Sequence, residues 1–103
     1  MLQELYHYSF AQRVASEEIE STFLLAILAV ESLHGPAKVR MEATHAFDAE
    51  HRTCVIDAST AVGQDLNRLF IGFVIREFGE DSFNVHRIEE TAGMATAEGR
   101  QTT

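Results

Sequence analysis

Residues 5–36 read LYHYSFAQRVASEEIESTFLLAILAVESLHGP. The segment 5–10 alternates aromatic with polar residues, which is the period of two that a half-buried β-strand requires. A helical period follows from Ser16, a residue suited to cap a helix, and two glutamates come directly after it. We expect this helix to end at Gly35, because Pro36 cannot continue it.

The next part of the chain predicts two strands joined by a short turn. Residues 38–47 alternate between apolar and polar positions, and residues 52–58 form a second strand-like run. The polar segment 48–51 between them indicates a β-hairpin. The apolar side of the first of these strands is expected to consist of Val39, Met41, Ala43, His45 and Phe47.

A second helix and a fourth strand complete the pattern. Ser59 or Thr60 can cap the helix, which is expected to continue to Phe78 and to stop at Gly79. The fourth strand is predicted over residues 82–88, where apolar and polar residues alternate again. The chain therefore contains a second strand-helix-strand unit after the first.

The predicted order of elements is β-α-β-β-α-β, the order of a ferredoxin-like split βαβ domain. Right-handed crossovers would place both helices on one face of a four-stranded antiparallel sheet. Residues 1–89 are accordingly expected to form a single α+β domain. Residues 90–103 follow neither period, so we expect them to be a mobile C-terminal tail.

Charge and cysteine content narrow the classes of partner and compartment. The chain has 103 residues, and 16 acidic against 8 basic residues give a net charge of -8. This charge repels nucleic-acid phosphates and anionic membranes, so neither is an expected partner.

One cysteine, Cys54, cannot form an internal disulfide, and residues 1–13 lack a secretory pattern, which favours the cytoplasm. The apolar run 23–30 is far shorter than the roughly twenty residues of a membrane span.

Both predicted helices carry more apolar residues than one buried face needs. The stripe of the first helix that can cover the sheet contains Ile19, Phe23, Ala26, Ile27, Val30 and Leu33. The corresponding stripe of the second helix contains Val62, Leu66, Leu69, Phe70 and Phe73. The large apolar residues that remain, and that point away from the sheet, are Leu24, Leu25, Leu28, Ile71, Ile75 and Phe78. Surplus apolar surface of this kind marks an interaction site, so we expect a homo-oligomer, most simply a homodimer. The alternative is that loops or the tail fold back over these helices.

Three polar residues are the best candidates for chemistry. If the fourth strand pairs antiparallel with the first, His7 and His86 become neighbours on the open side of the sheet, with Asn84 close by. Such a pair could act in general acid-base catalysis or bind a metal ion. The other polar residues expected on or near this face are Ser9, Arg40, Glu42 and Asp57. No two histidines have a tight metal-ligand spacing, so solvated or interface histidines are favoured, and neither a metal nor a cofactor is predicted.

Two other features receive structural interpretations. His45 and His51 flank the hairpin turn close to Cys54, but their spacing matches no compact zinc motif, and the apolar surroundings of Cys54 favour a small buried residue. The segment 57–63 runs from a strand into a helix start, where backbone N–H groups can bind an anion. It has no glycine-rich or lysine-containing phosphate motif, so helix capping explains it better.

Three functions are compatible with this sequence. The favoured one is a self-associating interaction or regulatory module without catalytic activity of its own, and a different protein partner is compatible with it as well. The second is a small dimeric α+β-barrel enzyme or ligand-binding protein, in which two open sheet faces enclose a cavity lined by His7, His86 and Asn84. The third is an acidic inhibitor that mimics nucleic acid, and it rests on net charge alone.

Overall fold

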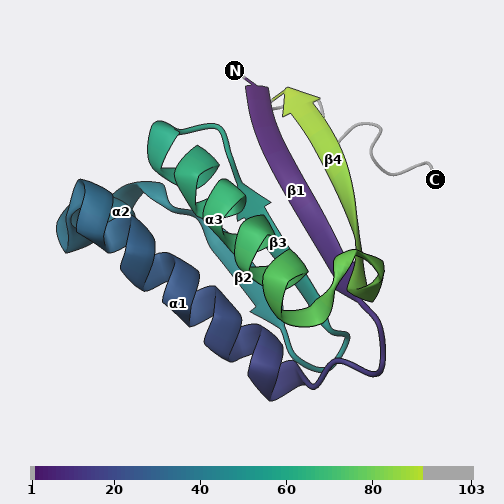
Figure 1. Ribbon diagram of the computed structural model, residues 1–103. Helices are drawn as coiled ribbons and strands as arrows, with labels where there is room; N and C mark the ends of the chain where they lie inside the picture. Colours follow the sequence, from purple (N-terminus) through teal and green to yellow (C-terminus); the bar gives the residue numbers. More distant parts are fainter. Residues whose placement is uncertain (1, 92–103) are drawn as a thin grey trace.

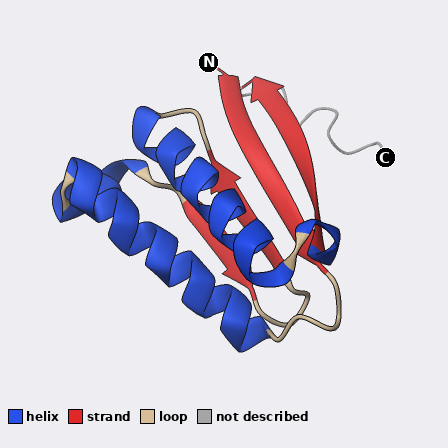
Figure 2. Cartoon of the chain, viewed as in Figure 1, coloured by secondary structure: helices blue, strands red, loops and turns tan. Residues whose placement is uncertain are grey.

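The computed structural model describes residues 2–91 of the chain. The elements follow one another as β1 (Leu2–Phe10), α1 (Ser16–His34), α2 (Pro36–Glu42), β2 (His45–Asp48), β3 (Thr53–Asp57), α3 (Ala61–Phe78), the 3-10 turn η1 (Glu80–Ser82) and β4 (Phe83–Thr91). The four strands form one antiparallel sheet in the order β2-β3-β1-β4, and α1 and α3 lie side by side over one face of it (Figures 1 and 2). The predicted α+β class is confirmed.

Strand β1 lies inside the sheet, and its alternation separates two environments. On the side that faces the helices, Tyr8 is fully buried and Phe10 is almost fully buried. The intervening His7 points to the other side and is only half-buried. The alternation of the opening stretch thus aims its aromatic residues at the helices, as expected from the period of two.

The core lies between the sheet and the two long helices. Phe70 of α3 is its central aromatic residue and makes edge-to-face contacts with Tyr8 and Phe23, at ring-centroid distances of 5.1 and 5.2 Å. Such pairs are worth about 0.5–1.5 kcal/mol beyond the area they bury. The other buried helix residues are Ile19, Ala26 and Val30 of α1 and Val62, Leu66 and Val74 of α3. Among residues 2–91, no helix covers the opposite face of the sheet.

The strand predicted over residues 38–47 is wrong in its first half. Residues Pro36–Glu42 form the helix α2, and only His45–Asp48 form a strand, β2. Pro36 occupies the first turn of α2, where its fixed φ and missing N–H suit a helix. Val39 and Ala43 are four residues apart and both buried, which is a helical spacing, whereas Met41 is 81% exposed.

The predicted ends of both long helices are confirmed. α1 ends at His34 before Gly35, and α3 ends at Phe78 before Gly79. The two glycines have φ values of 91° and 96°, in the region that favours residues without a Cβ. The N–H of Gly79 donates to the carbonyl of Ile75 and so satisfies one of the last acceptors of the helix.

The N-cap residue predicted for α3 is confirmed, and the one predicted for α1 is wrong. Thr60 caps α3, because its Oγ1 accepts a hydrogen bond from the N–H of Gly63. The cap predicted at Ser16 is wrong, since Ala15 occupies the N-cap position of α1. The hydroxyl of Ser16 instead donates to the carbonyl of Ala49 at 2.9 Å and ties the helix start to the β2–β3 turn.

The last strand is longer than predicted. β4 extends to Thr91, so the predicted start of the tail at residue 90 is wrong, and residues 92–103 of that tail lie outside the described residues. Within residues 2–91, no single helix has the length and apolar character needed to cross a membrane. α1 and α2 reach that threshold only when taken together, and the chain bends by 117° between them.

Candidate functional site

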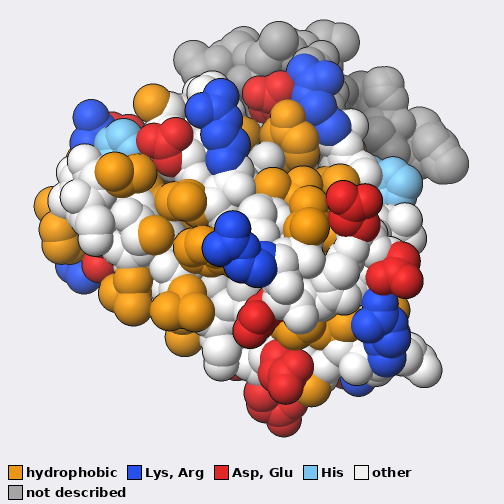
Figure 3. Space-filling view, in the orientation of Figure 1, with side chains coloured by type: hydrophobic (Ala, Val, Ile, Leu, Met, Phe, Trp, Pro, Cys, Tyr) orange, Lys and Arg blue, Asp and Glu red, His pale blue; other side chains and the backbone are white. Residues whose placement is uncertain are grey.

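The outer side of the helix layer exposes large apolar residues. Leu24, Leu25 and Leu28 of α1 are 56%, 58% and 58% exposed, and Ile75 of α3 is 38% exposed. We call these four residues the outer helix face. Figure 3 looks onto this side of the molecule, and hydrophobic side chains gather there over α1. More than half of the surface of each leucine remains in water, which is unfavourable for the single chain.

Not every residue predicted to point outward does so to the same extent. Ile71 and Phe78 are half-buried and pack against the core. They lie seven residues apart on one flank of α3 and therefore still reach the apolar interior. The prediction that Leu33 belongs to the buried stripe of α1 is wrong, because this residue is 65% exposed in the last turn of the helix.

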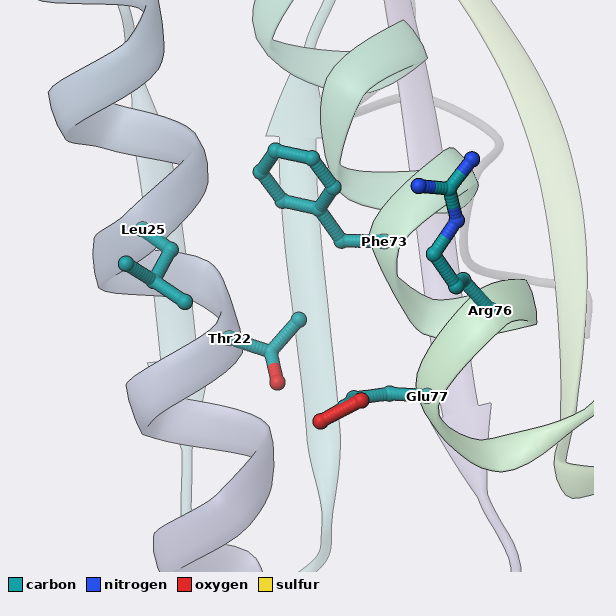
Figure 4. A pocket seen from close by; sticks show the side chains of 5 residues that line it. All are labelled: Thr22, Leu25, Phe73, Arg76 and Glu77. Atoms are coloured by element: carbon teal, nitrogen blue, oxygen red, sulfur yellow. The ribbon is translucent and has the colours of Figure 1, made fainter.

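A groove of about 250 Å³ runs between α1 and α3 next to the outer helix face. Its lining residues are Thr22 and Leu25 of α1 and Phe73, Arg76 and Glu77 of α3. Figure 4 shows Thr22, Phe73 and Glu77 pointing into the space between the helices, while Arg76 extends along α3. Apolar side chains form much of the groove, and the two charged residues lie at its α3 side. The sequence did not reveal this groove, because it arises only where the two helices lie next to each other.

The packing of the described residues does not require a glycine at position 72, which is exposed on α3. A Cβ added at Gly72 would meet no atom within 4 Å, and the residue is exposed. At Gly63, by contrast, an added Cβ would lie 2.0 Å from the carbonyl oxygen of Asp57, so packing requires a glycine there. Glycine in a helix interior is less stable than alanine by about 0.5–1 kcal/mol. An isolated glycine within a helical pattern is visible in the sequence, and it is the signal that could have marked this position.

The two long helices differ in charge. α1 contains four glutamates and no lysine or arginine, and no charged residue lies between Glu20 and Glu31. α3 carries two arginines, Arg68 and Arg76, and two acidic residues, Asp65 and Glu77, so its charges balance. The leucines of the outer helix face thus lie on an uncharged segment, with acidic residues before and after it.

On the other side of the sheet, the predicted pairing of two histidines is confirmed. His7 of β1 and His86 of β4 are direct cross-strand partners. Asn84 lies opposite Ser9, one step along the same pair of strands. We call this side the open sheet face, and its residues include Leu5, His7, Ser9, Ala46, Asp48, Thr53, Val55, Asp57, Asn84, His86 and Ile88.

The open sheet face lacks part of the predicted polar set. Arg40 and Glu42 lie on α2 and not on this face, because the segment that carries them is helical, so that prediction is wrong. Among residues 2–91, no three His, Cys, Asp or Glu side chains gather closely enough to hold a metal ion. The pair of His7 and His86 therefore has no third ligand from this part of the chain.

The hairpin histidines and the cysteine have separate surroundings. His45 packs on the ring of Phe23, with 4.7 Å between ring centroids. His51 lies 2.8 Å from Asp48, and its hydrogen bonds lower the pKa of that carboxyl group. Cys54 is buried, and burial raises the pKa of its thiol to about 12. A thiol with this pKa is a poor nucleophile and a poor ligand at neutral pH.

Several backbone donors of the segment 57–63 form internal hydrogen bonds. The N–H of Ser59 donates to Asp57 Oδ1 at 3.0 Å, and the N–H of Gly63 donates to Thr60 Oγ1 at 2.9 Å. The N–H groups of Asp57 and Ala58 donate to the carbonyls of Thr44 and Glu4. The side chain of Thr60 thus serves as the helix cap that the sequence predicts.

A second hollow, of about 220 Å³, lies at the beginning of α3. We call it the polar pocket, and its lining residues are Glu4, Tyr6, Ala58, Gln64, Asn67 and Arg68. Next to it, the buried hydroxyl of Tyr8 donates to Asn67 Oδ1. Burial raises the pKa of Tyr8 well above its usual range, so this hydroxyl stays protonated and remains a donor.

No protein-family model matches the chain, and a search of the curated proteins finds no match either. The candidate sites are therefore interpreted from the residues of this chain alone. They comprise the outer helix face with its groove, the open sheet face and the polar pocket.

Proposed function

We propose that the protein is a self-associating interaction or regulatory module, without catalytic activity of its own, whose two copies pack through their outer helix faces. The exposure of Leu24, Leu25 and Leu28 carries this proposal. Full burial of a leucine contributes about 1.5–3 kcal/mol, so covering the exposed half of three leucines in each of two copies would contribute on the order of 5–10 kcal/mol.

The uncharged centre of α1 and one pair of opposite charges support a second copy as the partner. We place the two-fold axis parallel to the helices, above the space between α1 and α3. This symmetry packs α1 of each copy against α3 of the other copy. The acidic residues of α1, such as Glu18, then approach Arg76 of α3. The uncharged segment around Leu28 avoids like-charge contacts between two chains that each carry a net charge of -8. Gly72 would let the partner backbone approach closely.

The size of the helix layer also fits a dimer. α1 has 19 residues and is therefore about 28 Å long, and two adjacent helices span about 20 Å. The flat footprint is then roughly 560 Å² on each copy, or about 1,100 Å² in total. This is just below the roughly 1,200 Å² at which stable specific interfaces begin, and it falls in the range of weak, transient complexes. A reversible dimer is the expected outcome.

We further propose a ferredoxin-like split βαβ plan and a cytoplasmic location. The first is supported by the strand order, in which β3 lies between β1 and β2 while β1 lies between β3 and β4. α2 is then an addition ahead of β2. The second is supported by the unpaired, buried Cys54. This fold plan hosts many unrelated activities, so the function rests on the surfaces and not on the fold.

Light scattering on a dilution series tests the self-association. The wild-type protein should reach twice its chain mass of 11.5 kDa at high concentration. Leu28→Asp should weaken the dimer by at least about 100-fold, because it buries an unpaired carboxylate in both copies. Leu33→Asp is the matched control, since Leu33 is exposed on the same helix but points away from the proposed contact. A wild-type protein that stays monomeric, or a Leu28→Asp variant that dimerises normally, would refute the proposal.

The dimeric α+β barrel remains a second candidate because of one observation. The cross-strand pair of His7 and His86 has apolar neighbours, and one of them, Ile88, is 40% exposed. Two open sheet faces packed together would cover them. In that case Ile88→Asp should dissociate the dimer and Leu28→Asp should not. No observation among the described residues favours an acidic mimic of nucleic acid.

A further inference from the structure

The polar pocket is built by three separate parts of the fold. Glu4 and Tyr6 come from β1, Ala58 follows β3, and the remaining residues come from the first half of α3. The N–H of Ala58 donates to the carbonyl of Glu4 at 2.7 Å and holds two of these parts together. The pocket is thus a product of the tertiary structure and not of one flexible segment.

Several polar groups of the pocket have hydrogen-bonding capacity to spare. Asn67 Oδ1 is occupied by the hydroxyl of Tyr8, which fixes the amide and leaves its NH₂ group as a donor. The hydroxyl of Tyr6 and the side-chain amide of Gln64 form no hydrogen bond with another residue in the described part of the chain. Unused polar groups that converge on one hollow are typical of a ligand site.

The pocket also has two walls of opposite charge. On the strand side, Glu4 Oε2 accepts hydrogen bonds from Arg87 at 2.7 Å, and no bond to Oε1 is present among the described residues. On the helix side, the Arg68 side chain is 78% exposed and lies 4.0 Å from Asp65. Glu4 Oε1 can accept from a cationic group, and Arg68 can donate to an anionic one. A ligand that carries both charges can contact both walls at once.

We propose that the polar pocket binds a small zwitterion of the α-amino-acid type. The ammonium group of the ligand faces Glu4, and its carboxylate faces the guanidinium of Arg68 and the NH₂ group of Asn67. The volume of about 220 Å³ is below the roughly 300–1,000 Å³ of pockets that hold drug-sized ligands, which indicates a small ligand. L-serine is a small ligand of this kind.

A titration by two-dimensional amide NMR tests the proposal with L-serine as the probe. L-serine should shift the backbone amides of Gln64, Asn67 and Arg68 in a saturable way, with a Kd of about 1 mM. Ethanolamine lacks the carboxylate and 3-hydroxypropionate lacks the ammonium group, so each should bind at least about tenfold more weakly. No saturable shift up to about 50 mM L-serine, or equal binding of either analogue, would overturn the proposal.

Variants assign the two charges to their residues. Arg68→Gln and Glu4→Gln should each weaken L-serine binding by about tenfold or more, whereas Arg68→Lys should retain part of it. Arg40→Gln is the charge-matched control, because it removes an exposed arginine of α2 that lines neither the polar pocket nor the groove. Amide shifts remote from the pocket report whether each variant is folded. Equal weakening by Arg40→Gln would contradict a specific site.

This inference does not depend on self-association. The pocket lies at the start of α3, while Leu28 lies on the outer side of α1. The L-serine titration is therefore repeated on Leu28→Asp. An unchanged Kd there supports a pocket that is complete within one chain, and loss of binding only in that variant contradicts it. The mass measurement and the titration can thus fail separately.

Discussion

The domain has two surfaces that no other described element covers, and they differ in how they meet water. On the outer helix face, Leu24, Leu25 and Leu28 stand together without an intervening charge. On the open sheet face, apolar residues alternate in space with His7, Asn84 and other polar groups. Antiparallel sheets commonly leave one such face solvated. An uncovered surface therefore calls for a partner when its apolar residues are contiguous, and not when polar residues separate them.

The largest expected effect concerns two neighbouring positions on β3. Cys54 faces the helices, and its thiol, with a pKa near 12, should react with a thiol reagent at pH 8 on the order of 1,000-fold more slowly than an ordinary cysteine. Thr53→Cys in a Cys54→Ala background should react at the ordinary rate, because position 53 lies on the open sheet face. The rate of absorbance change with the reagent measures both. A slow reaction at position 53 would mean that the open sheet face is covered.

Substitutions on the two sides of β3 should differ in their effect on the free energy of unfolding. Ile56→Ala should lower the free energy of unfolding by about 2–5 kcal/mol, because Ile56 is fully buried beneath the helices. Val55→Ala, its neighbour on the open side, should cost less than about 1.5 kcal/mol. Urea unfolding followed by circular dichroism gives both values. If the two losses were equal, the open sheet face would be a buried interface and the barrel dimer would be favoured.

The smallest effect is expected at Gly72, where one substitution should stabilise the separate chain but weaken the dimer. Gly72→Ala should stabilise the separate chain by about 0.5–1 kcal/mol, since the added methyl group meets no other atom and alanine favours the helix. In the dimer, the same methyl group would occupy the close approach and weaken association. Unfolding of the Leu28→Asp variant with and without Gly72→Ala measures the first term, and light scattering measures the second. Stronger association of Gly72→Ala would count against close packing at this point.

Local patterns made several parts of the fold predictable from the sequence. The alternation around Tyr8, the glycines that end α1 and α3, and the cap at Thr60 each depend on residues that are near one another in the chain. The register of His7 against His86 followed from the order of elements. These features share one property, which is that a short segment and an elementary rule are sufficient to specify them.

Other parts could not be predicted, for physical reasons. At α2, Val39 and Ala43 satisfy a period of two as well as a spacing of four, and Pro36 can end one helix or begin the next. The polar pocket and the interhelical groove each combine side chains from separate elements. Which polar groups are already bonded, such as Asn67 Oδ1, depends on tertiary contacts that no local pattern encodes.

The hydroxyl of Thr60 has two partners, and this limits how the position can vary during evolution. It accepts from the N–H of Gly63 and donates to the carbonyl of Glu42, so one side chain joins the start of α3 to the end of α2. Aspartate is usually an excellent residue at a helix start, but an ionised carboxylate cannot donate. Chains descended from a common ancestor with this one should therefore keep threonine or serine here, and aspartate should be rare despite its general suitability.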